Sequence, residues 1–390
     1  MIVEPKSKGF ICTTAHPTGC YKNVEEQIAY AKRAGESHTA NKGRTWKKAL
    51  VIGSSAGYGL ASRIAAAFTC KAATIGVMFE RPATGKRTAT AGWYNTQAFD
   101  KMAKEAGLYS KSINGDAFSD EIKKEVIKTI RQDLGKVDLV IYSLAAPRRT
   151  APDGSSYASV LKTVGGAFTT KSLNLNNNEV VTAALEPAAE EEIEGTVKVM
   201  GGEDWELWID ALKEADVLEE NALTIAYSYI GPKLTYPIYY SGTIGQAKKH
   251  VLETAGKINE KYGDVRAYVS VNKAVVTQSS SAIPAVPLYL SIMYKVMKEQ
   301  KLHEGCIEQM VRLFTEKLGV EEIPLDEEGR IRLDDWEMKP EVQDAIMKVW
   351  DEVSTENVAA LCDIEGYWDD FFRMFGFRIP GVDYGADVEV

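Results

Sequence analysis

Hydrophobic and polar positions alternate along the first part of the chain in the order typical of an α/β protein. Short apolar runs indicate buried strands, and between them apolar residues recur every three or four positions, as in amphipathic helices. Strands are expected at 48–52, 73–79, 109–113 and 137–143, and helices at 60–68, 94–105 and 119–134. This order predicts a Rossmann-type, doubly wound parallel sheet with helices on both faces.

The pattern changes in the middle of the chain. Two alternating segments within about 165–183 flank a polar turn and predict an inserted β-hairpin. An acidic helix start follows at 186–194, and Trp205 and Trp208 are expected to pack against the core from a helix.

The α/β rhythm then resumes, with strands at 223–229 and 266–271 around a helix at 243–259. The last part, about 300–390, predicts a helical extension. Because no repeat and no flexible linker interrupts the chain, we expect a single elaborated domain over residues 1–390.

A glycine-rich turn directly follows the first predicted strand and reads Gly53-Ser54-Ser55-Ala56-Gly57-Tyr58-Gly59. Glycines let the backbone approach a pyrophosphate closely, and the following helix offers free N–H groups and the positive end of its dipole. The next strand ends at Phe79-Glu80, about 21 residues on, near the spacing of a ribose-binding acid. Its carboxylate can accept hydrogen bonds from ribose hydroxyls and repels a 2′-phosphate, which favours NADH over NADPH.

Ligands of such sheets lie outside the carboxyl ends of the strands, so two further strand ends are candidate sites. Asp116-Ala117 follows the third strand, where an acid beside a small residue can hold the adenine. Leu144-Ala145 follows the fourth, where small residues let a cofactor lie close to the backbone. For Asp116 an ordinary turn or helix start is an equally good interpretation.

Composition and charge exclude several classes of function. The net charge of −9 argues against a general nucleic-acid binder or an anionic-membrane binder. The five cysteines and four histidines show no metal-ligand spacing, so we expect a reducing compartment and no metal site. No apolar stretch has the length of a signal peptide or a membrane span, and we expect a cytoplasmic protein without a membrane partner.

Tyr239 and Lys248 are candidates for the chemistry that a hydride-transferring fold requires. A phenol near a cationic lysine has a lowered pKa and can donate a proton to a developing oxyanion. The ammonium can also bind the hydroxyls of the nicotinamide ribose. Tyr240 and Lys249 have the same spacing, so the spacing by itself does not identify the pair.

Several longer motifs place this pair in a family context. They include His16-Pro17-Thr18-Gly19-Cys20, Gly92-Trp93-Tyr94-Asn95, Ala226-Tyr227-Ser228-Tyr229-Ile230-Gly231, the segment from Ile238 to Lys249, and Gly381-Val382-Asp383-Tyr384. Over almost its whole length the chain resembles the trans-2-enoyl-CoA reductases and the related FabV-type enoyl-acyl-carrier-protein reductases. Two departures conserve the residue class: Val275 is often Leu in relatives, and Tyr240 replaces a common Trp.

The resemblance implies roles for individual residues. Tyr239 would be the proton donor, Lys248 would bind the cofactor and support Tyr239, and Tyr229 would hydrogen-bond the thioester carbonyl. The implied lining of the NADH site is Gly53, Ser54, Ser55, Ala56, Gly57, Tyr58, Phe79, Glu80, Asp116, Ala117, Leu144, Ala145, Lys248, Val275, Val276 and Thr277.

The implied reaction is hydride transfer from NADH to C3 of a short trans-2-enoyl-CoA such as crotonyl-CoA, with Tyr239 stabilising and protonating the enolate. An acyl carrier protein is the alternative carrier. The basic residues Arg148, Arg149, Lys162 and Lys233 do not decide between the two carriers, because they can dock an acidic protein or bind the phosphates of coenzyme A. A noncatalytic NADH-binding regulatory protein is the alternative from another class. The retention of Tyr229, Tyr239 and Lys248 beside the cofactor motifs argues against it.

Two further expectations concern the substrate and the assembly. The apolar stretch 282–293 is interpreted either as a wall for the acyl chain or as a plain core helix. The resemblance implies a monomer.

Overall fold

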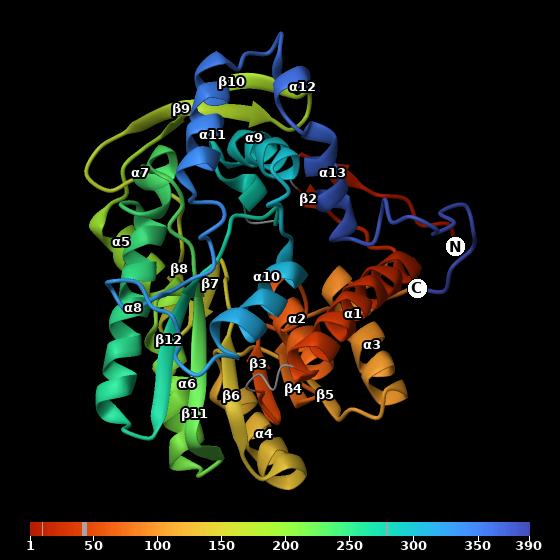
Figure 1. Cartoon of the computed structure of the whole chain (residues 1–390), viewed down its shortest axis with the longest axis vertical. Helices are drawn as coiled ribbons and strands as arrows, with labels where there is room; N and C mark the ends of the chain where they lie inside the picture. The colour runs from red at the N-terminus through yellow and green to blue at the C-terminus, as the bar shows by residue number, and fades with distance from the viewer. Residues whose placement is uncertain (10, 41–44, 278–279) are drawn as a thin grey trace.

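A seven-stranded sheet, parallel throughout, forms the centre of the molecule, with the strand order β13-β12-β11-β6-β3-β4-β5 (Figure 1). The computed structural model describes residues 1–9, 11–40, 45–277 and 280–390. The strands are β3 (Lys48–Ile52), β4 (Ala73–Met78), β5 (Ser110–Asn114), β6 (Val137–Tyr142), β11 (Leu218–Ser228), β12 (Val265–Val271) and β13 (Ile331–Arg332). The order reverses between β3 and β6, which is where doubly wound sheets bind ligands.

Helices cover both faces of the sheet, because successive side chains of a buried strand point to opposite sides. Ala49 and Val51 of β3 pack into one core cluster, and Leu50 and Ile52 pack into another. The first face carries α1 (Pro17–Ala40), α2 (Gly57–Ile64) with the π-helix η1 (Ala65–Thr69), α3 (Ala91–Glu105), and α10 (Cys306–Arg312) with the π-helix η5 (Leu313–Lys317). The second carries α4 (Asp120–Thr129) with the π-helix η2 (Ile130–Leu134), α6 (Glu203–Glu214) and α8 (Thr243–Lys261).

A third cluster of buried side chains lies beyond the end of the sheet, at the top of Figure 1. Its elements are the hairpin β9 (Phe168–Asn174) and β10 (Glu179–Leu185), and the helices α9 (Val286–Glu299), α11 (Pro340–Glu352), α12 (Val358–Leu361) and α13 (Ile364–Arg373). We call these six elements the outer layer.

Shorter elements complete the described chain: β1 (Ser7–Lys8), β2 (Ile11–Cys12), β7 (Arg148–Thr150), β8 (Ser156–Ala158), α5 (Glu190–Met200), η3 (Lys233–Thr235), α7 (Tyr236–Tyr239) and η4 (Ser280–Ala282). Within these residues, no helix combines the length and the apolar character needed to cross a bilayer. The described side chains also contain no cluster of three or more His, Cys, Asp or Glu that could hold a metal ion.

The architecture confirms the Rossmann-type prediction, and the hairpin forms as expected, with β10 ending at Leu185. β11 begins earlier than predicted, at Leu218, and its register with β6 shifts between Leu218 and Leu223. The sequence did not indicate this start, because the polar residues Glu219, Glu220 and Asn221 interrupt the apolar run. The short edge strand β13 was not predicted, since two residues carry no periodic signal. The single-domain organisation stays a prediction.

The C-terminal extension contains the helices α10 to α13, but residues 318–339, which include β13, and residues 374–390 contain no helix. Trp205 and Trp208 are fully buried on α6, which confirms that they serve helix packing.

Candidate active site

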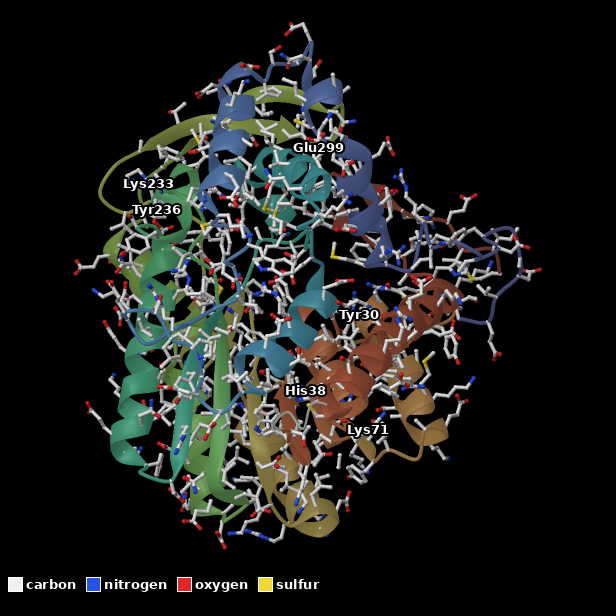
Figure 2. The ribbon with its side chains drawn as sticks, in the orientation of Figure 1. Tyr30, His38, Lys71, Lys233, Tyr236 and Glu299 are labelled. Atoms are coloured by element: carbon white, nitrogen blue, oxygen red, sulfur yellow. The ribbon has the colours of Figure 1, made fainter. Side chains whose placement is uncertain are left out.

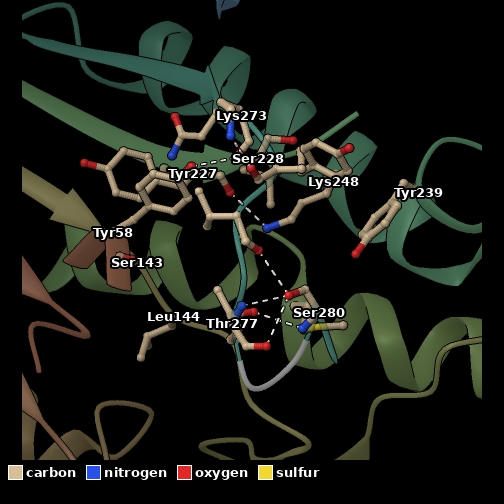
Figure 3. Close-up of a pocket in the computed structure, with 18 of the residues that line it drawn as sticks. Tyr58, Ser143, Leu144, Tyr227, Ser228, Tyr239, Lys248, Lys273, Thr277 and Ser280 are labelled. Carbon is tan, nitrogen blue, oxygen red and sulfur yellow. Dashed lines mark hydrogen bonds between the residues drawn. The ribbon is translucent and has the colours of Figure 1, made fainter. Parts of the chain in front are cut away.

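A cavity of about 260 Å³ lies where β6, β11 and β12 end, beside the start of α2 (Figure 3). Several predicted site residues line it: Tyr58, Leu144, Ala145, Tyr229, Tyr239, Lys248, Val275 and Thr277. They come from four stretches of the chain, at 58, 144–145, 229–248 and 275–277, and the convergence of the parallel strand ends brings them together.

Tyr239 is one of the polar side chains that line this cavity. It ends the short helix α7, and its hydroxyl points into the cavity in Figure 3. Its ring meets the ring of Tyr229 edge to face, with centroids 4.6 Å apart and planes at 89°. Within the part of the chain that the structure describes, the Tyr239 hydroxyl has no hydrogen-bond partner, so it is available to a ligand.

The ionisation of Tyr239 differs from the sequence-based expectation. Burial raises the pKa of its phenol, and the negative charge of Glu337 raises that pKa further. The expected lowering by Lys248 is wrong, because the Lys248 ammonium is turned to the carbonyl oxygen of Tyr227, to which it donates a hydrogen bond of 2.9 Å. Tyr239 is therefore a neutral phenol, which is the form that can donate a proton.

Lys248 stands on α8 and also lines the cavity. Burial lowers the pKa of its ammonium to about 8. Among the described residues, the bond to the Tyr227 carbonyl is the one hydrogen bond of this ammonium, which has three N–H donors. Two donors therefore remain for hydroxyl groups of a ligand.

The glycine turn after β3 is built for close backbone approach. A Cβ on Gly53, whose φ is +83°, would meet the carbonyl oxygen of Ser143 at 2.0 Å, and one on Gly59 would meet the carbonyl oxygen of Gly53 at 1.8 Å. The following helix α2 begins after Ala56 without a side-chain cap, so its first N–H groups stay free for an anion. The hydroxyl of Ser54 donates to the carbonyl of Val77 at 3.1 Å and ties the turn to β4.

The end of β4 faces this turn. The hydroxyl of Ser55 donates to Oε1 of Glu80 at 2.6 Å, so the carboxylate is held beside the glycines. Position 92 requires glycine in this arrangement, because a Cβ on Gly92 would lie 2.0 Å from Oε1 of Glu80. Phe79 is 77 % exposed, which leaves a large apolar ring uncovered by protein at this strand end.

The structure does not bring every predicted residue into the cavity. Those outside it are Gly53, Ser54, Ser55, Ala56, Gly57, Phe79, Glu80, Asp116, Ala117 and Val276. Most of them follow β3, β4 and β5, which continue the same edge of the sheet away from the cavity. Oδ1 of Asp116 accepts the N–H of Phe118 at 3.0 Å, as in an ordinary turn, and the N–H of Val276 donates to the Tyr294 hydroxyl at 3.1 Å.

Several lining residues were missed by the sequence analysis: Tyr142, Ser143, Met200, Ala226, Tyr227, Ser228, Val251, Asn272, Lys273, Ala274 and Ser280. The strand-end rule, applied to β11 and β12, would have found Ser228 and Asn272. Met200 has no local signal, because it arrives from the end of α5. In the stretch 282–293, Val286 reaches the cavity while Leu288, Leu290 and Ile292 are fully buried in the outer layer, so most of it is core helix.

Two of the basic residues expected to meet the carrier are already paired. Arg149 is 2 % exposed and donates to Glu203 at 2.6 Å, and Lys162 donates to Glu192 at 2.7 Å. Arg148 and Lys233 remain exposed. The geometry thus offers fewer free cations for docking an acidic partner than the sequence suggested.

The chain matches three family models along its length. Residues 87–319 match "Trans-2-enoyl-CoA reductase catalytic region", residues 2–85 match "NAD(P)H binding domain of trans-2-enoyl-CoA reductase", and residues 325–388 match "Enoyl reductase FAD binding domain".

Individual relatives are similar over their full length. A trans-2-enoyl-CoA reductase [NADH] of Clostridium perfringens is 57 % identical, with 100 % of this chain and 99 % of the relative covered. An enoyl-[acyl-carrier-protein] reductase [NADH] of Flavobacterium psychrophilum is 54 % identical, with 99 % and 97 % covered. The crystal structure of the Treponema denticola trans-2-enoyl-CoA reductase in complex with NAD is 50 % identical, with a TM-score of 0.97 and coverage of 100 % and 98 %.

Residues 325–388, all of them described, do not fit the flavin that the third model names. None of them lines the cavity at the strand ends. The aromatic side chains Tyr367 and Phe371 of α13 are fully buried within the outer layer. Trp336 lines a second cavity of about 590 Å³, next to Tyr30 and His38 (labelled in Figure 2). That cavity is also lined by Arg312, which is paired with Glu304, and by Glu308 and Glu316, whose negative charge opposes the phosphates of a dinucleotide.

Proposed function

Because this chain belongs to the trans-2-enoyl-CoA reductase family, we propose that it reduces a short trans-2-enoyl-CoA to the saturated acyl-CoA with NADH. The observation that carries the proposal is the hydroxyl of Tyr239, which has no hydrogen-bond partner among the residues that the structure describes and lines a cavity together with Tyr229 and Lys248 at the strand ends of a Rossmann-type sheet.

The residues around the glycine turn suit the adenosine half of NADH. The free N–H groups of α2 would bind the pyrophosphate, and Glu80 would accept hydrogen bonds from the adenosine ribose. Phe79, Asp116 and Ala117 would border the adenine, which is a prediction from their place on the same sheet edge.

The cavity suits the nicotinamide half and the substrate. Lys248 would bind the nicotinamide ribose with its two remaining donors. Leu144, Ala145, Val275 and Thr277 would form the walls, with Val276 buried behind them. NADH, when bound there, supplies a hydride for C3 of the enoyl thioester.

The tyrosines would handle the charge that develops on the thioester oxygen. Tyr239 would donate a hydrogen bond or a proton to the enolate, and its raised pKa keeps the phenol protonated until that charge appears. Tyr229 would hydrogen-bond the same oxygen. Protonation at C2 then completes the saturated acyl thioester.

We also propose that the carrier of the acyl group is coenzyme A. The 57 % identity to the Clostridium perfringens trans-2-enoyl-CoA reductase supports this carrier. The pairing of Arg149 with Glu203 and of Lys162 with Glu192 leaves fewer free cations for either carrier. The acyl carrier protein is the second candidate, supported by the 54 % identity to the Flavobacterium reductase. A monomer that acts in the cytoplasm remains our prediction.

The test is NADH oxidation, followed by absorbance, with crotonyl-CoA, a long-chain enoyl-CoA and a crotonyl-carrier protein. We expect turnover on crotonyl-CoA, loss of turnover in Tyr239→Phe by at least about 100-fold, and NADH binding that is unchanged in that variant. Tyr240→Phe is the matched control, because Tyr240 is 50 % exposed and outside the cavity. No oxidation with any enoyl thioester, or full activity in Tyr239→Phe, would contradict the proposal.

A further inference from the structure

Glu337 is a fully buried carboxylate directly behind the two tyrosines, between β13 and α11. Its Oε1 accepts hydrogen bonds from the hydroxyl of Tyr289 at 2.7 Å and from the hydroxyl of Tyr229 at 3.1 Å. Its Oε2 accepts the N–H of Ala274 at 2.8 Å. Both Tyr229 and Ala274 line the cavity, so the carboxylate contacts two parts of the cavity wall without lining it.

We propose that Glu337 is a positioning residue of the reductase, which holds the hydroxyl of Tyr229 and places a buried negative charge behind Tyr229 and Tyr239. This inference rests on the proposed function of the cavity. Glu337 does not touch the cavity and acts through the tyrosines.

The hydrogen-bond count explains how the carboxylate can position Tyr229 and still release it. A phenol hydroxyl has one hydrogen to donate, and in this structure the hydroxyl of Tyr229 donates it to Glu337. To donate to the substrate oxygen, Tyr229 must turn this hydrogen away. Glu337 would keep the shorter bond from Tyr289 and the bond from Ala274, so its charge would stay solvated by protein.

The two tyrosines therefore differ before substrate binds. The hydroxyl of Tyr239 has no partner among the described residues and is ready to donate, whereas that of Tyr229 is committed. The charge of Glu337 raises the pKa of both phenols, in addition to the effect of burial. Both are thus kept protonated until a stronger negative charge forms on the substrate.

The charged and titratable groups around Glu337 fix the sign of its pH dependence. Lys273 faces it from the end of β12, Tyr289 from α9, and Asp334 from the preceding turn. Burial raises the pKa of Glu337, and Asp334 adds to this, while Lys273 and the hydrogen bond from Tyr289 oppose it. The ionised form, which accepts three hydrogen bonds, is lost as the pH falls through this raised pKa. We therefore expect kcat to fall at low pH as Glu337 becomes protonated, and we call this fall the acid limb of the kcat profile.

The test compares Glu337→Gln with Glu304→Gln in steady-state assays with crotonyl-CoA and saturating NADH. Glu304 is the matched control, since it is 4 % exposed, pairs with Arg312 and does not contact either tyrosine. In Glu337→Gln we expect kcat to fall about 10- to 100-fold, NADH affinity to be unchanged, and the acid limb of the kcat profile to disappear. Glu304→Gln should keep both the limb and the wild-type kcat.

Tyr289→Phe is the second variant and keeps the test decisive if Glu337→Gln does not fold. It removes a hydrogen bond that lowers the pKa of Glu337, so the acid limb should move to higher pH. A wild-type kcat and an unmoved limb in Glu337→Gln or Tyr289→Phe would overturn the role of Glu337, with the reductase assignment intact. Absence of turnover in the wild-type enzyme would overturn the proposed function instead.

Discussion

Gly59→Ala tests whether the tight turn after β3 holds the NADH pyrophosphate. A Cβ at this position would lie 1.8 Å from the carbonyl oxygen of Gly53, whereas real Cβ contacts are essentially never under 3.0 Å. The obstacle is backbone, so a flexible side chain cannot give way. The first turn of α2 and the turn before it must separate by more than about an ångström, as happens when a tight site is overpacked.

The expected loss follows from the bonds that this shift breaks. Overpacking of this kind costs about 1 to 3 kcal/mol of folding stability. A hydrogen bond from an N–H group to a phosphate is worth about 1.5 to 3 kcal/mol, so loss of one such bond raises the Kd for NADH about 10- to 100-fold. The free N–H groups of α2 are the donors at stake.

The assay is NADH binding by fluorescence titration, together with the urea midpoint of unfolding. Gly256→Ala is the matched control, because a Cβ on this glycine of α8 meets nothing within 4 Å and should leave binding unchanged. Wild-type NADH affinity in a folded Gly59→Ala protein would refute the assignment of the turn to the pyrophosphate.

Three further predictions test the charges of the site and the core. Because the pKa of the Lys248 ammonium lies at about 8, NADH affinity should fall as the pH rises through that value. Lys248→Arg should remove this pH dependence of NADH affinity in fluorescence titrations, and an unchanged pH dependence would count against the role of Lys248. Glu80→Gln removes the charge that repels a 2′-phosphate, so the ratio of kcat/KM for NADPH to that for NADH should rise at least about tenfold, and an unchanged ratio would argue against Glu80 at the ribose. Asp204→Ala leaves Lys123 buried without its charged partner at 2.8 Å, which should cost about 3 to 5 kcal/mol in urea unfolding. Glu25→Ala removes the partner of Lys22 at an exposed pair on α1 and should change stability little; equal losses would contradict the burial argument.

The succession of strands and helices along the chain, the parallel sheet and the glycine turn were determined by the sequence itself. These features have local causes: buried strands need continuous apolar runs, and a turn with a backbone atom 1.8 Å from a would-be Cβ needs glycine at that position. The ends of β3, β4 and β6 could therefore be assigned to a nucleotide site before their neighbours were known. Tyr239 and Lys248 needed the family motif in addition, because Tyr240 and Lys249 have the same spacing.

The tertiary structure alone decided which groups act on one another inside the site. Glu337 lies 108 residues from Tyr229 in sequence, yet its negative charge raises the pKa of both tyrosines. Burial and the charge of Glu337 raise the pKa of the Tyr239 phenol, where the sequence predicted a pKa lowered by Lys248, and Lys248 instead donates to the Tyr227 carbonyl. Hydrogen bonds and charges between distant segments leave no periodic trace in the chain, since they depend on which strand ends meet and on how much water the packing excludes.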